Sequence, residues 1–200
     1  MEGIFSGLLL YEVVLLILGV FLFLILSVGL LFYIIRKEQI KKLLLFFVLP
    51  IIMIAYPSIK EISISKDKIQ LTKYQEEFIK NPNDSVAREK VIEYTKKLED
   101  RASSPEDNVQ ISKSKLLLGN HNEAIDFANK ASSKDSANAE ARNIRSLATL
   151  EKTVQESPQE SVRNVQMDSI IQDLPVSREI QQLKPFLSKQ AVQRLNQSNR

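Results

Sequence analysis

Cysteine is absent from the 200-residue chain, and histidine occurs only once. Without cysteine, disulfides, thiol catalysis, zinc-thiolate sites and iron–sulfur sites are excluded. The single histidine, His121, leaves no basis for most catalytic triads or for His-rich metal sites. The sequence also lacks a glycine-rich phosphate loop, carboxylates at metal-binding spacing and a Gly-x-Ser-x-Gly elbow. We therefore expect no enzyme activity, no catalytic, cofactor-binding or metal-binding residue, no cofactor and no small-molecule substrate.

Charge is scarce in the first part of the chain and balanced in the rest. Residues 1–60 contain five basic and three acidic side chains, which leaves 22 basic and 21 acidic ones for residues 61–200. The basic residues of the second part alternate with acidic ones and do not cluster. Nucleic-acid binding depends on a basic patch, so it is not expected.

Two long uncharged runs dominate the N-terminal part. Val13–Ile35 contains 23 residues without a charge, and as a helix it would span roughly 35 Å. That length exceeds the roughly 30 Å hydrocarbon core of a bilayer. The second run, Leu43–Ile59, contains 17 residues, and Pro50 should kink it. We predict a transmembrane hairpin over residues 1–60, with helices at about 8–35 and 43–59.

The connector between these runs predicts their orientation. Residues 36–42 carry four positive charges and one negative charge, whereas the first eleven residues carry only Glu2. Under the positive-inside rule the connector lies in the cytoplasm and both termini lie outside. We expect an integral protein of a bacterial inner membrane with a periplasmic C-terminal domain; the alternative is the inverted hairpin. Glu12, beside Tyr11, is expected at the outer interface, where it needs no functional role; the alternative is a functional carboxylate within the membrane.

Beyond the second run the apolar residues follow the helical period of 3.6. Ile59, Ile62 and Ile64 come first, and they fit either a helix end or a short strand. Later helix starts are indicated by Asp84 as an N-cap and by Ser104 followed by Pro105. Further helices are expected over 121–133, 136–155 and from Ser157 to Pro175, and one or two more in the tail. Period-2 alternation long enough for a sheet is missing, so the predicted fold class is all-α.

The passage from Ile111 to Ala141 resembles a tetratricopeptide repeat (TPR). Gly119 stands between its two helices, Ala124 and Ala131 follow at the family's small-residue positions, and Asp135 lies in the closing turn. The departures from the family pattern are Lys115 at an aromatic position, Ala128 at the Phe position and Ser136 at the closing Pro position.

The resemblance implies an array of antiparallel helix pairs. Such an array would form a TPR-like domain over 61–176, with its clearest repeat at 105–138 and a capping helix or tail at 177–200. The three pairs would be 67–102, 105–135 and 137–174, because about three units are needed to bury a common core. At the family's aromatic position after Gly119, His121 is expected to pack or cap.

The resemblance also implies that the first helix of each pair lines a concave face that binds a protein or peptide. Transferring that face to this sequence selects Val109, Gln110, Lys113, Leu116, Leu117, Asn143, Ile144 and Leu147. The alternative for Leu116, Leu117 and Leu147 is a place in the core. Gln110 and Asn143 are expected to be exposed amides.

The predicted function is therefore a membrane-anchored protein-interaction module or scaffold. The alternative is a structural accessory subunit of a membrane complex, such as a cytochrome c maturation-like assembly factor, with the hairpin as its main contact.

Overall fold

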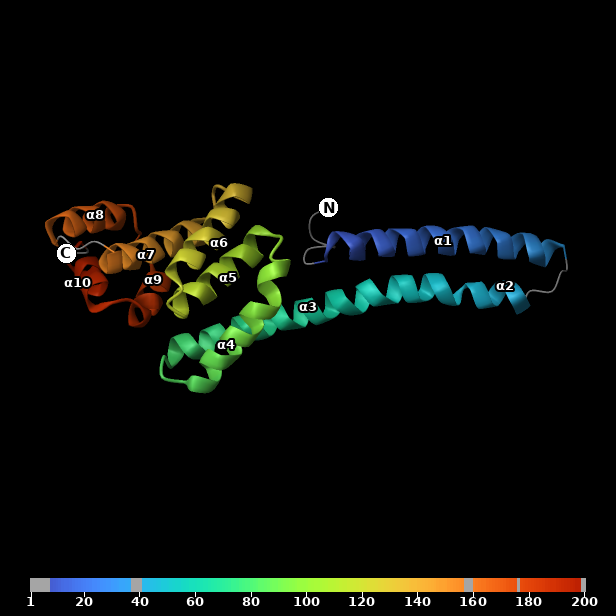
Figure 1. The fold of residues 1–200 in the computed structure, drawn as a ribbon, viewed down its shortest axis with the longest axis horizontal. Coiled ribbons are helices and arrows are strands. Elements are labelled where there is room, and N and C mark those ends of the chain that lie inside the picture. Colours follow the sequence, from blue (N-terminus) through green and yellow to red (C-terminus); the bar gives the residue numbers. More distant parts are fainter. Residues whose placement is uncertain (1–7, 37–40, 157–159, 176, 199–200) are drawn as a thin grey trace. The chain divides into compact units, whose positions relative to one another are not determined.

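The chain folds into helices, as Figure 1 shows for a computed structural model of residues 8–36, 41–156, 160–175 and 177–198. Helices make up 87% of the structure, and none of the described residues forms a strand. The all-α prediction is therefore confirmed. The chain divides into two compact units, Met1–Lys66 and Asp67–Arg200, here called unit 1 and unit 2.

Unit 1 consists of apolar helices. It contains α1 (Leu10–Ile35), α2 (Lys41–Phe46) and the first part of α3 (Val48–Lys80). By length and composition, α1 and the helical stretch that begins at Leu43 are each able to cross a membrane. Large apolar side chains such as Leu24, 57% exposed, lie on their surfaces. Residues 37–40 of the predicted connector lie outside the described part of the chain.

Glu12 closes the N-terminal end of α1. Its carboxylate accepts a hydrogen bond from the backbone N–H of Leu9 at 2.8 Å and another from the Tyr11 hydroxyl at 3.3 Å. A carboxylate in the first turn satisfies free helix N–H groups and interacts favourably with the helix dipole. The side chain is buried in the structure. Its contacts therefore assign it a helix-capping role at the edge of the apolar run.

Pro50 interrupts the second apolar run. Helix α2 ends at Phe46, four residues before the proline, and α3 begins at Val48. A proline ring clashes with the carbonyl four residues earlier and cannot donate a hydrogen bond to it. The kink predicted at Pro50 is therefore present as a break between α2 and α3 at Phe47. The Phe47 ring packs edge-on against Phe23 of α1, with the ring centroids 5.5 Å apart.

Helix α3 continues well past the end that we predicted at Ile59. It includes Pro57 and the isoleucines at 59, 62 and 64, so this passage is helical. The predicted span ended at Ile59 because Lys60 ends the uncharged run, but a charged residue does not end a helix. The helix ends at Lys80, where Asn81 and Pro82 follow. The division between the two units falls within this helix, after Lys66.

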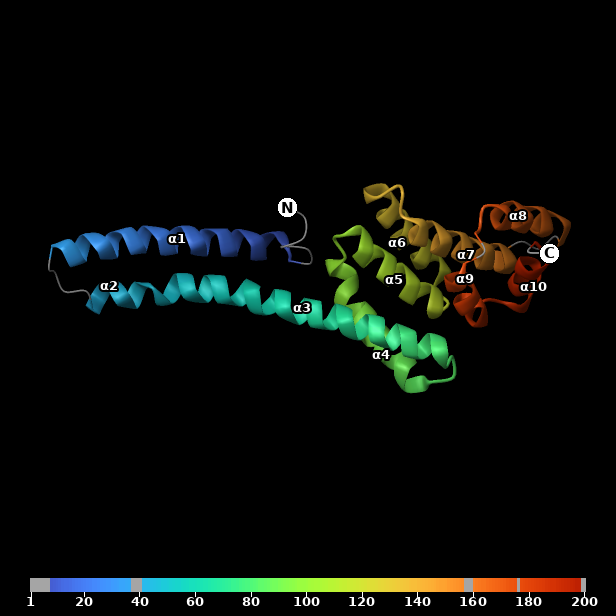
Figure 2. The same ribbon diagram turned by 180° about the vertical axis from the view of Figure 1, so that it is seen from behind.

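Within unit 1, α1 approaches α3 closely at one glycine. A Cβ atom added to Gly19 would lie 3.0 Å from both Met53 Cβ and Ile54 Cγ1. Gly29, further along the same helix, has no atom within 4 Å of such a Cβ. Figure 1 and Figure 2 both show α1 beside the α2–α3 stretch. Gly19 thus allows α1 and α3 to approach more closely than they could with a side chain at this position.

Unit 2 contains the second part of α3 and the remaining helices. These are α4 (Ser85–Leu98), η1 (Glu99–Arg101), α5 (Pro105–Leu117), α6 (His121–Lys134), α7 (Ala139–Glu156), α8 (Glu160–Gln172), α9 (Arg178–Leu183), η2 (Lys184–Phe186) and α10 (Lys189–Ser198).

The predicted caps account for the helix starts. Asp84 accepts a hydrogen bond from the backbone N–H of Ala87 at 2.9 Å, and Ser104 forms a reciprocal capping box with Asp107. Helix α7 begins three residues later than predicted because the side chain of Asn138 caps it, accepting from the N–H of Ala141 at 2.9 Å. The start signal at 157–159 lies outside the described residues.

Helices α5 and α6 form a tightly packed pair. Gly119 has φ +80°, a left-handed conformation that glycine adopts without strain, and it ends α5. Ala124, Ala128 and Ala131 are fully buried on α6. The Ser112 hydroxyl on α5 donates to the Ala124 carbonyl at 2.6 Å, so the two backbones lie close together. Small residues are needed along this contact.

Lys115 has a structural role at the position where the repeat family has an aromatic residue. Its Nζ lies 2.6 Å from Glu99 Oε2 and 2.5 Å from Glu123 Oε2, although only 8% of the residue is exposed. Burial opposes the charge, but the hydrogen bonds to the two carboxylates outweigh it and raise the pKa of Lys115. The lysine thus links η1 to α6 through α5.

Enlarging the buried alanines should destabilise unit 2. We expect Ala124→Leu and Ala131→Leu each to lower the free energy of unfolding by about 1 to 3 kcal/mol, because extra methylenes do not fit a close helix contact. Ala139→Leu, at an exposed helical position, is the matched control. Thermal unfolding of the full chain in detergent measures this; an unchanged midpoint in both buried variants would contradict the packing.

Substitutions of the two glycines of α1, Gly19 and Gly29, should also differ in their effect on stability. Gly19→Val should weaken the α1–α3 contact by about 1 to 3 kcal/mol, because its side chain overlaps Met53 and Ile54. Gly29→Val makes the same chemical change where there is open space. The thermal midpoints of both variants in one detergent test this, and equal midpoints would argue against the close approach at Gly19.

Candidate functional site

The predicted partner-binding residues lie on α5 and α7, and most of them are buried. Val109 and Leu117 on α5 and Leu147 on α7 belong to the core, with Leu147 0% exposed. Leu116 and Ile144 are equally buried. Of the two interpretations of Leu116, Leu117 and Leu147, the core position is the one that their burial matches. A partner would have to displace neighbouring side chains to reach them.

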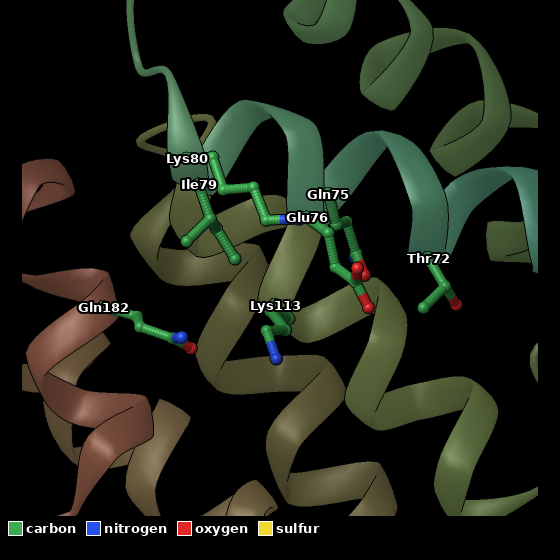
Figure 3. A pocket seen from close by; sticks show the side chains of 7 residues that line it. All are labelled: Thr72, Gln75, Glu76, Ile79, Lys80, Lys113 and Gln182. Carbon is green, nitrogen blue, oxygen red and sulfur yellow. The ribbon is translucent and has the colours of Figure 1, made fainter.

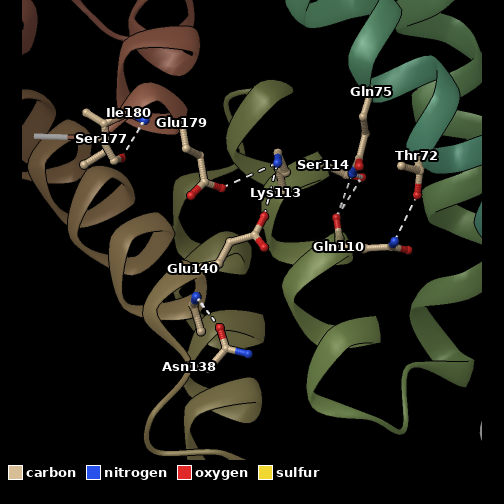
Figure 4. A network of polar contacts seen from close by, with 11 residues as sticks. Thr72, Gln75, Gln110, Lys113, Ser114, Asn138, Glu140, Ser177, Glu179 and Ile180 are labelled. Atoms are coloured by element: carbon tan, nitrogen blue, oxygen red, sulfur yellow. Dashed lines mark hydrogen bonds and ion pairs between the residues drawn. The ribbon is translucent and has the colours of Figure 1, made fainter. Parts of the chain in front are cut away.

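Gln110 and Asn143 are not the exposed amides that we expected. Asn143 is 9% exposed, and Gln110 is half-buried. The Gln110 side chain donates a hydrogen bond to Thr72 Oγ1 at 2.9 Å, and its backbone carbonyl accepts one from Gln75 at 2.8 Å (Figure 4). The prediction was wrong because it placed α5 on an open surface. In the structure, α3 packs along this side of α5 and uses both polar groups of Gln110.

Further polar contacts join α3 to α5. The buried Gln75 side chain also donates to Ser114 Oγ at 2.7 Å. Closer to the start of α5, Lys68 Nζ lies 2.6 Å from Asp107 Oδ1. Buried amides and hydroxyls are costly unless they are paired, so these contacts fix how α3 aligns with α5.

Lys113, the one charged residue among the predicted site residues, connects three helices. Its Nζ lies 3.1 Å from Glu140 Oε1 on α7 and 3.5 Å from Glu179 Oε1 on α9 (Figure 4). Burial, followed by the neighbouring Glu140 carboxylate, raises the pKa of Glu179, while Lys113 opposes this shift. The structure thus places two carboxylates around one ammonium group.

A pocket of about 240 Å³ opens beside Lys113. Figure 3 shows that α3 supplies one wall of this pocket and that α5 and α9 supply the others. Its lining mixes amides, charges and apolar atoms, from Thr72, Gln75, Glu76, Ile79, Lys80, Lys113 and Gln182. We call this pocket and the adjoining sides of α3, α5 and α7 the α3–α5–α7 face.

The C-terminal tail contacts this face, and sequence reasoning did not detect it. Glu179 reaches Lys113, Gln182 lines the pocket, and the Phe186 ring packs against Phe78 of α3 with centroids 5.0 Å apart. Residues 177–187, here called the tail segment, therefore contact α3 and α5, which are distant from the segment in sequence. The cap predicted at 177–200 reflects the apolar spacing of this segment, but that spacing did not indicate which surface the segment contacts.

His121 is buried at the start of α6, as a packing role requires. Burial lowers the pKa of its imidazole, although the nearby Glu151 carboxylate has the opposite effect. Glu151 is also buried and accepts a hydrogen bond from the Ser188 N–H at 2.6 Å, close to the start of α10. Among the described residues, no three His, Cys, Asp or Glu side chains are grouped so that they could hold a metal ion.

Comparisons of the chain with family models, with curated proteins and with solved structures find no match.

Proposed function

We propose that this chain is a membrane-anchored, TPR-like module that binds a protein segment on the α3–α5–α7 face. The observation that carries this proposal is the open pocket on that face, whose lining of mixed polarity comes from α3 and from Lys113 of α5, with Gln182 as the one residue from the tail segment. Such a surface suits a peptide, which offers both apolar side chains and backbone hydrogen-bonding groups. The buried alanines and Gly119 support the TPR-like arrangement, since close pairing of helices depends on small residues at these positions.

The proposed anchor is a hairpin of α1 with the α2–α3 stretch in a bacterial inner membrane. Its exposed apolar side chains, such as Leu24 and Leu45, suit contact with lipid tails. The positive charges at 36–42 favour a cytoplasmic connector and a periplasmic unit 2. These same exposed side chains would also suit packing against helices of a larger membrane complex, which is the alternative function.

The orientation can be tested with protease. When protease is added to sealed, right-side-out membranes, we expect digestion of the region beyond Ser58, because the positive connector keeps the hairpin loop inside. Antibodies against an epitope tag at the C-terminus would follow the digestion, and detergent-opened membranes would serve as the control. Protection of the C-terminal region until the membranes are opened would instead indicate the inverted hairpin.

Partner binding can be tested by photo-crosslinking from single positions of the full chain in native membranes. A photoreactive residue at Glu76, exposed on the pocket wall, should give an adduct of defined mass with a partner protein. The same residue at Glu89, exposed on α4, is the matched control and should give none.

A third position separates the two functions. A photoreactive residue at Leu24 samples the surroundings of α1, where a subunit of a membrane complex would meet its neighbours. Adducts from Leu24 without any from Glu76 would favour the accessory-subunit function over the interaction module.

A further inference from the structure

The tail segment shows what kind of ligand the α3–α5–α7 face can hold. Its apolar side chains Ile180, Leu183 and Phe186 recur at every third residue, so they lie along one side of α9 and η2. Ile180 and Leu183 are 3% and 1% exposed, and the Phe186 ring rests on Phe78. The tail segment is thus a short amphipathic helix with a buried apolar side, and it contacts the face through Glu179, Gln182 and Phe186.

The polar end of this segment is held less favourably than its apolar side. Lys113 is nearer to Glu140 than to Glu179, and the Oε1 atom of Glu179 has no hydrogen bond within the described part of the chain. One ammonium group cannot neutralise two carboxylates, and like charges in a partly buried site repel each other. The raised pKa of Glu179 agrees with this geometry, since it means that the site favours the uncharged form of the side chain.

We infer that the tail segment is a detachable occupant of the face, and that the partner which replaces it is an amphipathic helix with an uncharged hydrogen-bond donor where the tail has Glu179. Such a donor, for example an amide, would pair with Glu140 without adding a second negative charge. This inference rests on the proposed function, because it concerns the same face. Until a partner arrives, the tail covers apolar surface that would otherwise be exposed to water.

The test uses two labelled peptides of residues 177–188, one native and one with Glu179→Gln, and measures their binding to the full chain in detergent by fluorescence anisotropy. In the chain, Leu183→Ser removes a buried anchor and loosens the tail, whereas Glu179→Gln removes the repulsion and tightens it. The exposed Gln181→Ala on the same helix is the matched control. A scrambled peptide of the same composition measures adsorption to the micelle.

We expect the native peptide to bind the Leu183→Ser chain about tenfold more tightly than the wild-type chain, because a free face is populated more often. It should bind the Glu179→Gln chain more weakly than wild type, while Gln181→Ala should change nothing. On the loosened chain the Glu179→Gln peptide should bind about tenfold more tightly than the native one, because the amide adds no second negative charge beside Glu140. Circular dichroism checks that each chain remains folded.

Three results would overturn the inference. Equal affinity for all chains would mean that the peptide binds elsewhere, and no binding to any chain would mean that the face does not accept such a helix from solution. Tighter binding of the native peptide than of the Glu179→Gln peptide would reject the uncharged donor. The proposed function is judged separately, because crosslinking from Glu76 detects a partner whatever the tail does.

Discussion

The enclosure of helix α5 is the constraint on which the rest of unit 2 depends. Nine of its thirteen residues are buried, and five of these nine are polar or charged: Asp107, Asn108, Ser112, Ser114 and Lys115. A buried polar group without a partner costs about 1 to 3 kcal/mol. An element that supplies a hydrogen-bond or ion-pair partner for one of these groups must therefore lie at a defined position along α5. These positions determine how the helices align.

Three neighbouring elements, α3, α6 and η1, supply hydrogen-bond and ion-pair partners for the buried side chains of α5. Gln75 of α3 donates to Ser114, the backbone of α6 accepts from Ser112, and Glu99 of η1 shares Lys115 with Glu123 of α6. These contacts have directional geometry, unlike the apolar contacts around them. They explain how a helix with alternating Ser and Lys residues can occupy the centre of a small domain.

Lys113 extends the same pattern to the tail. It is the point where α5, α7 and α9 meet, and here the charges do not balance, since Glu140 and Glu179 compete for one cation. The buried Lys115 on the same helix also meets two carboxylates, but these lie at 2.5 and 2.6 Å and the pKa of the lysine is raised. The two lysines therefore differ in how closely their carboxylates approach, at 3.1 and 3.5 Å for Lys113 against 2.6 and 2.5 Å for Lys115.

Local signals in the sequence predict the helices and most of their ends. Asp84, Ser104, Pro105 and Gly119 act through backbone hydrogen bonds and dihedral angles within a few residues, so their effect can be read locally. The apolar runs likewise identified the two candidate spans, because span length depends only on composition and helix rise. The end predicted at Ile59 was too early, because Lys60 ends an uncharged run but not the helix that contains it.

Which helix faces remain exposed depends on contacts that form only in the folded chain. Gln110 was expected on the surface, yet α3 covers it. The sequence also did not predict the ion pair between Glu179 and Lys113, which are 66 positions apart. Periodicity identifies the apolar side of each helix but not the helix that will cover it, because that choice depends on contacts between distant segments. The pocket beside Lys113 and the contacts of the tail segment are therefore results of packing between segments that are far apart in the sequence.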